Sequence, residues 1–313
     1  MPELSICIVT YERPAFLRRC LNSIAEHVSG AEVVVVDASV AEDAAGAERA
    51  FPGVCYVHRP DLAGWMTRSR NEALLHTTGT VIAFLDDDVV ISPRWEQGLM
   101  DAFASNPHPD AVAGRTRNLL PGEERYETPI GRLRADGTLT AGFAQLPYGV
   151  LDVDHGIGAN MSFTRVVLAR LGGFRDDYPG TAMREDTDVF LRIKRLNGRA
   201  VFAPEARVDH LPGPHIKGRR FDTRYKLYGR RNHVVLLARH AGLGSAMLRR
   251  WIRADLASVV RAGGPLRVLQ RAGVTVIGIG WGLVAAVRDA KWRPLSPIRS
   301  GAAAEQVRSA LSE

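Results

Sequence analysis

Cysteine is scarce in this sequence, since its 313 residues contain three, Cys7, Cys20 and Cys55. The number is odd and the spacing matches no metal-binding pattern, which argues against a disulfide framework or a zinc finger and fits a reducing compartment. The first residues carry no basic segment ahead of an apolar run, so we expect no secretory signal. We predict a cytoplasmic protein, either free or peripheral at the inner face of the plasma membrane.

Two common nucleotide-binding motifs are also absent. No Gly-x-x-x-x-Gly-Lys-Ser/Thr loop is present, and the turn after the first apolar run, Thr10-Tyr11-Glu12-Arg13, contains no glycine. These absences argue against an ATPase and a dinucleotide-dependent oxidoreductase. A sugar nucleotidyltransferase, which stays an alternative, would need a glycine-rich loop with a lysine at this turn.

No apolar run reaches the roughly 20 residues that a helix needs to cross a bilayer. The longest uncharged stretch, residues 272–287, has 16 residues and four glycines. We interpret it as an interfacial or re-entrant helix. A helical cover on the N-terminal domain and a true membrane span are the alternatives.

Positive charge is concentrated near the C-terminus. Residues 213–313 contain 19 Lys/Arg and 5 Asp/Glu, a net charge of +14, whereas the rest of the chain contains 22 and 29, a net charge of −7. Such asymmetry is typical of contact with nucleic acid or an anionic membrane. A non-catalytic nucleotide or nucleic-acid binding module is an alternative, but acidic residues would repel phosphate without a metal. We predict no nucleic-acid partner and a basic amphipathic tail at residues 241–313 that contacts a membrane surface.

Apolar runs alternate with helical patterns along the first hundred residues, which predicts an α/β fold with a mostly parallel sheet flanked by helices. The predicted strands are Leu4–Thr10, Glu32–Asp37 and residues 54–58 and 80–85, and the predicted helices are Pro14–His27 and residues 41–50 and 67–76. A fourth helix should begin at Ser92 and Pro93, with the serine as N-cap and the proline as first helical residue.

Three consecutive aspartates, Asp86, Asp87 and Asp88, follow the last of these strands. Adjacent carboxylates repel one another, so they persist at low cost beside a cation or a strongly polar ligand. Parallel sheets bind ligands at the carboxyl ends of their strands, where residues 10–13 and Asp37 also fall. Oxygen-rich sites of this kind suit Mg²⁺ or Mn²⁺ shared with substrate phosphates. We therefore expect a nucleotide site with a divalent cation; a solvated turn is the alternative.

The second half of the chain adds two helices to this pattern. One should run over residues 165–171 and end at Gly172-Gly173, and the other should open at residues 184–188 and end before Asn197. Acids in the first turn of a helix complement its dipole, so Glu185 and Asp186 are either caps or proton acceptors kept ionised. Residues 111–148 show no clear period, and no order of elements is predicted there.

Taken together, these motifs resemble the family 2 glycosyltransferases over about residues 3–240. In the family's order they are Thr10-Tyr11-x-Arg13, Asp37-x-Ser39, Arg70-Asn71, Leu85-Asp86-Asp87-Asp88, Gly158-x-Asn160, Gly172-Gly173-Phe174, Glu185-Asp186-x-Asp188 and Arg192. The resemblance implies the A-type nucleotide-sugar fold for a catalytic domain at residues 1–240. It also implies a metal-dependent inverting transferase.

The resemblance implies a role for each residue of the site. Asp86 and Asp88 would bind the metal, with His210, or alternatively His215, completing its ligands. Asp186 would be the catalytic base, with Glu185 beside it. The implied nucleotide-binding residues are Thr10, Tyr11, Glu12, Arg13, Asp37, Arg70, Asp86 and Asp87. The residues implied on the acceptor or donor-sugar side are Gly158, Asn160 and Asp188.

The partners follow from the same resemblance. The cofactor would be Mn²⁺ or Mg²⁺, and the donor a nucleoside-diphosphate sugar, with UDP and dTDP sugars favoured because they are common in the family and GDP sugars left open. The acceptor would be a carbohydrate or a lipid-linked molecule in polysaccharide, glycolipid or natural-product biosynthesis. Ala38 stands where the family usually has a second acidic residue.

Overall fold

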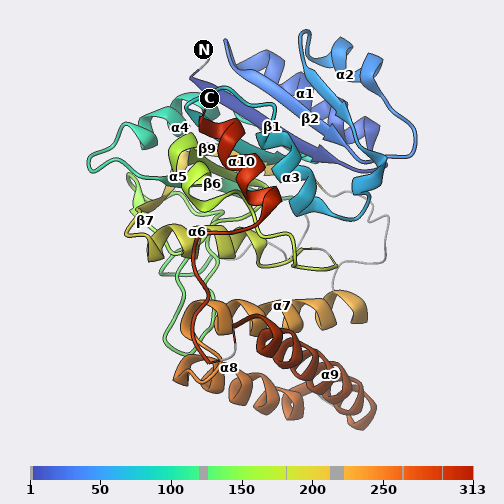
Figure 1. Ribbon diagram of the computed structural model, residues 1–313, viewed down its shortest axis with the longest axis vertical. Helices are drawn as coiled ribbons and strands as arrows, with labels where there is room; N and C mark the ends of the chain where they lie inside the picture. The colour runs from blue at the N-terminus through green and yellow to red at the C-terminus, as the bar shows by residue number, and fades with distance from the viewer. Residues whose placement is uncertain are drawn as a thin grey trace.

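Four parallel strands form the N-terminal half of a sheet in the computed structural model (Figure 1). The structure describes residues 3–119, 126–180, 182–211, 222–262, 264–290 and 292–312. In spatial order they are β3 (Cys55–His58), β2 (Glu32–Asp37), β1 (Leu4–Thr10) and β4 (Val81–Asp86). Valines fill β2 because both faces of this part of the sheet are covered by helices, so residues of either orientation are buried.

The other half of the sheet mixes strand directions. The order continues with β8 (Asn160–Thr164), β6 (Ala111–Asn118), β9 (Ala200–His210) and β5 (Val89–Ile91), and β7 (Leu151–Asp152) pairs with β9. Strand β8 is antiparallel to β4 and β6, whereas β6 is parallel to β9. The α/β class is confirmed, but parallel pairing is confined to β1–β4 and to β6 with β9.

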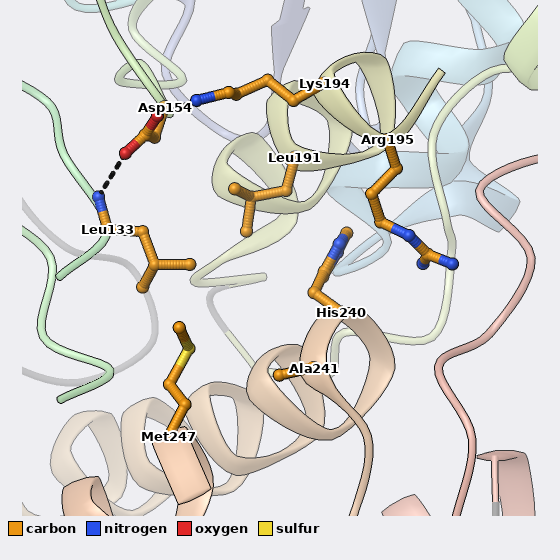
Figure 2. Close-up of a pocket in the computed structure, with 8 residues that line it drawn as sticks. All are labelled: Leu133, Asp154, Leu191, Lys194, Arg195, His240, Ala241 and Met247. Carbon is orange, nitrogen blue, oxygen red and sulfur yellow. Dashed lines mark hydrogen bonds and ion pairs between the residues drawn. The ribbon is translucent and has the colours of Figure 1, made fainter. Parts of the chain in front are cut away.

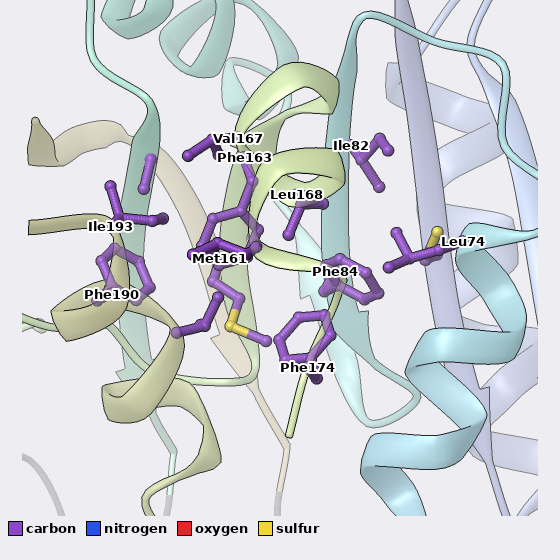
Figure 3. Packing of buried hydrophobic residues seen from close by; sticks show 14 of the residues in the cluster. Leu74, Ile82, Phe84, Met161, Phe163, Val167, Leu168, Phe174, Phe190 and Ile193 are labelled. Atoms are coloured by element: carbon purple, nitrogen blue, oxygen red, sulfur yellow. The ribbon is translucent and has the colours of Figure 1, made fainter. Parts of the chain in front are cut away.

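Two helical layers cover the sheet, each over its own apolar core. One core contains side chains of α1 (Pro14–His27), α2 (Ala44–Ala50) and α4 (Trp95–Phe103). The other contains side chains of α3 (Met66–Leu74), α5 (Arg165–Leu171), α6 (Glu185–Arg195) and α10 (Ala302–Ser312). Figure 3 shows the second core, where Phe84, Phe163, Phe174 and Phe190 meet in edge-on and tilted ring contacts.

Most predicted boundaries hold within two residues, but two helix starts are wrong. Helix α2 begins at Ala44 instead of residue 41. Helix α4 begins at Trp95 with Arg94 as its N-cap, instead of at Ser92 and Pro93. The backbone N–H of Ser92 donates to the carbonyl of Arg207, 3.0 Å away, which extends the pairing of β5 with β9. Ser92 therefore continues the pairing of the edge strand, and the helix starts two residues later than predicted.

A third layer of helices lies below the sheet in the view of Figure 1. It comprises α7 (Thr223–Ala241), α8 (Ala246–Ala257) and α9 (Pro265–Ala290), around a core that includes Val234, Leu248 and Ile279. Short 3-10 turns occur at Pro60–Leu62 and Val259–Ala262. Helix α10 then returns to the sheet beside α5 and α3. The division of the chain at residue 240 stays a prediction.

Candidate metal and nucleotide site

Asp86, Asp88 and His210 come together beside the carboxyl end of β4. One ligand atom from each lies within 4.8 Å of the others. Asp86 ends β4, Asp88 lies in the turn to β5, and His210 ends β9, where it pairs with Val89 of β5. Two carboxylates and one imidazole form a donor set that suits Mn²⁺ or Mg²⁺. The three predicted ligands therefore fit a divalent cation.

The ring of His210 is oriented by a residue that the sequence did not reveal. His210 Nδ1 lies 2.8 Å from Asn118 Oδ1 and Nε2 lies 3.0 Å from Asp88 Oδ1. An amide oxygen only accepts, so Nδ1 carries a proton, and Nε2 is the nitrogen that would bind a metal held by Asp88. Asn118 ends β6 opposite His210 in the sheet. The alternative ligand His215 lies outside the described residues.

The aspartate triplet divides into two environments. Asp87 is fully buried, accepts a hydrogen bond of 2.6 Å from Thr10 Oγ1 and forms an ion pair with Arg13. Burial raises the pKa of Asp87 to about 7, although Arg13 opposes the shift. Burial also acts to raise the pKa of Asp88, but His210 and Arg13 outweigh it and hold the value below the ordinary one. The burial of Asp87 and Asp88 excludes a solvated turn, and Asp87 lies apart from the metal cluster.

The loops after β1 and β2 are tied together where the nucleoside was predicted to bind. The backbone N–H of Glu12 donates to Ser39 Oγ at 2.6 Å, and Glu12 Oε1 accepts from the N–H of Val40 at 2.8 Å. Asp37 Oδ1 accepts from the N–H of Ser39 at 2.8 Å, and the Tyr56 hydroxyl donates to Asp37 Oδ2. Tyr56 lies on β3, and nothing in its local sequence indicated this contact.

Arg70 joins the metal cluster to the start of α6. Its side chain is 2% exposed; it forms an ion pair with Glu185 and lies 3.3 Å from both Asp86 Oδ1 and the carbonyl oxygen of Gly158. Burial raises the pKa of Glu185 to about 7, although Arg70 opposes the shift. A Cβ at Gly158 would lie 3.0 Å from Arg70 Nη2, so a larger residue there would press on this bridge.

Asp186 lies in the first turn of α6, one residue after Glu185. Its Oδ2 accepts from the N–H of Gly158 at 3.2 Å, and its Oδ1 accepts from the N–H of Thr187 at 2.6 Å. The loop before α6 is held by α7, because Asn232 Nδ2 donates to the carbonyls of Pro179 and Met183. The helical layer thus fixes the start of α6.

Two of the predicted sugar-side residues lie in buried hydrogen-bond networks and are not brought to the metal cluster. Asn160 accepts from Trp95 Nε1 at 3.0 Å and donates to two backbone carbonyls. Asp188 accepts from the Tyr178 hydroxyl and from His240 Nε2, each at 3.0 Å. Burial acts to raise the pKa of Asp188, but the contacts with His240 and neighbouring arginines hold it well below its ordinary value.

A pocket of about 320 Å³ lies away from these residues, between α6 and the junction of α7 with α8 (Figure 2). Lys194, Arg195, His240 and Met247 are among the residues that line it, and Lys194 forms an ion pair with Asp154 there. The pocket shares no lining residue with the metal cluster. It is therefore not the predicted nucleotide site.

The architecture is that of the A-type glycosyltransferase fold. The mannosyltransferase PcManGT from Pyrobaculum calidifontis, whose structure was solved in complex with GDP-Man and Mn²⁺, superposes with a TM-score of 0.52 at 19% identity. The match covers 92% of this chain and 86% of that chain. At this identity the likeness establishes the fold alone.

The sequence establishes the family. The profile described as Glycosyl transferase family 2 matches residues 5–171, more than half of the chain, so the protein belongs to glycosyltransferase family 2, a family of enzymes. The glucosyl-dolichyl phosphate glucuronosyltransferase of Haloferax volcanii is 28% identical over 160 residues, 49% of this chain and 50% of that protein. The succinoglycan biosynthesis protein ExoM of Rhizobium meliloti is 28% identical over 222 residues, 68% of this chain and 67% of that protein. The chain thus spans about half the length of the first relative.

Proposed function

We propose that this protein is a metal-dependent inverting glycosyltransferase that moves a sugar from a nucleoside-diphosphate sugar to an acceptor hydroxyl. The observation that carries the proposal is the cluster of Asp86, Asp88 and His210, which Arg70 links to the first turn of α6 and Asp186. The Mn²⁺ in the PcManGT structure supports a metal in this fold. Mn²⁺ or Mg²⁺ held by the cluster would neutralise charge on the departing diphosphate.

Asp186 acts as the general base in this proposal. Its carboxylate takes the proton of the acceptor hydroxyl while that oxygen bonds to the anomeric carbon and the bond to the diphosphate oxygen breaks, so one displacement inverts the configuration. The N-terminus of α6 favours the ionised form. Glu185 is less suited to this role, because it is buried and already paired with Arg70.

The loops after β1 and β2 bind the nucleoside, with Tyr11, Glu12 and Asp37 at the loop junction. Thr10 and Arg13 act indirectly, because both hold Asp87 and so fix the turn that carries the metal ligands. We assign Asp188 and Asn160 a supporting role, since both lie in buried networks behind the site.

A UDP or dTDP sugar is the proposed donor, on the resemblance to the family. The proposed acceptor is a carbohydrate or a lipid-linked molecule at the cytoplasmic side of a membrane. The relative from Rhizobium meliloti is named for succinoglycan biosynthesis, and the relative from Haloferax volcanii for a dolichyl phosphate substrate. Both names support a role in polysaccharide or glycolipid synthesis.

Thermal unfolding with UDP, dTDP and GDP, each with Mn²⁺ or with EDTA, tests the proposal. A ligand at 100 times its dissociation constant adds about 2.7 kcal/mol of stability, a shift that is easily measured. We expect a metal-dependent shift for one base that Asp88→Asn abolishes. Asp101→Asn, an exposed carboxylate on α4, is the matched control and should keep the shift. A shift that is equal in EDTA would contradict the metal site, and no shift for any nucleotide would contradict the proposal.

A further inference from the structure

Helix α9 turns its large apolar side chains outward. Leu266, Leu269, Val276, Ile277, Val284 and Val287 are between 52% and 78% exposed. At 3.6 residues per turn, these six positions fall within an arc of about 100° on one face of the helix. Gly273 and Gly280 lie on the same face, and a Cβ at either position would meet no atom within 4 Å. Solvent therefore faces an apolar stripe along most of the length of α9.

The opposite face of α9 is fixed to α7. A Cβ at Gly282 would lie 2.7 Å from Val234 Cβ, and one at Gly278 would lie 2.9 Å from Arg230 Cβ. These two glycines let the helix backbones approach closely, and Ile279 and Ala286 are buried beside them. The inner face of α9 is thus complete, so the exposed stripe is a separate surface and not an unfilled part of the core.

The helix that carries this stripe and the two helices packed with it are rich in cations. Residues 223–290 contain 12 Lys/Arg and 2 Asp/Glu, a net charge of +10. Both acids are paired, Asp255 with Arg230 and Asp289 with Arg239. The exposed cations on α7, α8 and α9 are Arg224, Lys226, Arg249, Arg250, Arg253, Arg267, Arg271 and Arg288.

The charge decides between two occupants of the stripe. A second copy of the chain would bring the same cationic layer against itself, and like charges at an interface are unfavourable. An anionic lipid surface complements both the apolar stripe and the exposed cations of these helices. By length and composition α9 could also cross a bilayer, but its attachment along α7 would draw Arg230 and Arg231 into the hydrocarbon.

We propose that α9 docks this protein on an anionic lipid bilayer, with the helix lying in the plane of the membrane. The apolar stripe enters the boundary between headgroups and acyl chains, and the arginines of α8 and α9 contact lipid phosphates. Docking does not depend on the proposed transferase activity. If that activity also holds, docking confines the enzyme to the surface where a lipid-linked acceptor is found.

Flotation with lipid vesicles tests the docking surface. Phosphatidylcholine vesicles with and without phosphatidylglycerol are mixed with the wild type, with the double variant Val276→Asp/Val284→Asp, and with Val166→Asp as matched control. Val166 is 78% exposed on α5, so Val166→Asp adds a carboxylate at a similarly exposed valine away from α9, one carboxylate against the two of the double variant. We expect the wild type and the control to float with anionic vesicles, and the double variant to partition at least about tenfold less.

Further conditions separate in-plane docking from a membrane span and from a dimer. Binding should weaken on neutral vesicles and in about 0.5 M salt, because the attraction of the arginines is then absent or screened. Association that resists salt would overturn the in-plane arrangement in favour of a span. Failure of the wild type to float, or unchanged flotation of the double variant, would overturn docking. A dimer in light scattering that the double variant abolishes, without vesicle binding, would assign the stripe to a second copy.

Equal thermal unfolding of the three proteins shows that the substitutions leave the fold intact. No nucleotide or metal enters this experiment, so its failure is distinct from failure of the proposed function.

Discussion

Arg70 and Glu185 form an ion pair in the interior although they lie 115 residues apart in the chain. The same guanidinium lies 3.3 Å from Asp86, a member of the metal cluster. A buried ion pair is often no more stabilising than apolar residues of the same volume. We therefore interpret the pair as a positioning device that holds the first turn of α6 at a fixed distance from Asp86.

Replacement of the proposed base should affect turnover and leave binding intact. General-base assistance contributes about 10²- to 10⁴-fold, so Asp186→Asn should lower kcat by that factor. The nucleotide-dependent shift in thermal unfolding should persist, because Asp186 lies outside the metal cluster. Steady-state kinetics and a thermal scan measure the two effects. Loss of nucleotide binding together with activity would contradict the role of Asp186, and Asp101→Asn controls for the loss of one carboxylate.

Removal of the amide that orients His210 should weaken the metal site. Partners that orient a metal-binding histidine are typically worth 10- to 100-fold in metal affinity, so Asn118→Ala should raise the dissociation constant of Mn²⁺ by about that factor. Calorimetric titration with Mn²⁺ measures this dissociation constant. Asn22→Ala, at an exposed position of α1, should change nothing. Unchanged affinity in Asn118→Ala would show that Asn118 does not orient a metal-binding histidine.

The network around Asp188 should make stability depend on pH. A pKa held below its ordinary value of 3.8 means that the carboxylate stabilises the fold above that pH and loses its contribution as the pH falls toward the folded-state pKa. Asp188→Asn leaves Arg192 without its acidic neighbour and should cost about 3 kcal/mol near pH 7.

The cost of Asp188→Asn should shrink when urea unfolding is repeated near pH 3, where the unfolded wild type is protonated. The exposed Asp152→Asn should cost far less at pH 7. A cost that is the same at both pH values would mean that lost packing, and not lost charge, explains the effect.

Two glycines of α9 should respond in opposite directions to the same substitution. Gly282→Ala would place a Cβ 2.7 Å from Val234 Cβ and 2.9 Å from the carbonyl oxygen of Arg231, so it should destabilise the helical layer by about 1–3 kcal/mol. Gly280→Ala meets open space and should stabilise the helix by roughly 0.5–1 kcal/mol. Chemical denaturation measures both, and a similar effect at the two positions would contradict the close packing of α9 on α7.

Local patterns predicted those parts of the fold that local physics decides. Strands β1 and β2 and helices α1 and α5 have the predicted bounds. In these four elements the periodicity of the apolar residues and the residues that begin or end an element, such as glycine and proline, indicate the same limits. Gly172, for example, takes a positive φ of 69° as the C-cap of α5. Helix α4 differs because pairing of β5 with β9, a distant strand, competes with the capping signal at Ser92.

The metal cluster was predictable in part. The order of motifs indicated Asp86, Asp88 and His210, but the contacts that orient them depend on strand register. Asn118 faces His210 across 92 residues of sequence, and Tyr56 reaches Asp37 from a neighbouring strand. Contacts of this kind come from sheet pairing, so no pattern within a short window could reveal them.

Helix α10 gives the chain a particular order of completion during synthesis. Arg165 donates to the carbonyls of Ala310 and Leu311, and Val307 and Leu311 belong to the core under α5. The helical layer of α3, α5, α6 and α10 therefore includes residues that leave the ribosome after the whole of α7, α8 and α9. Domains generally fold in the order in which they emerge. Here the layer of α3, α5 and α6 lacks α10 until helices α7, α8 and α9 have been made.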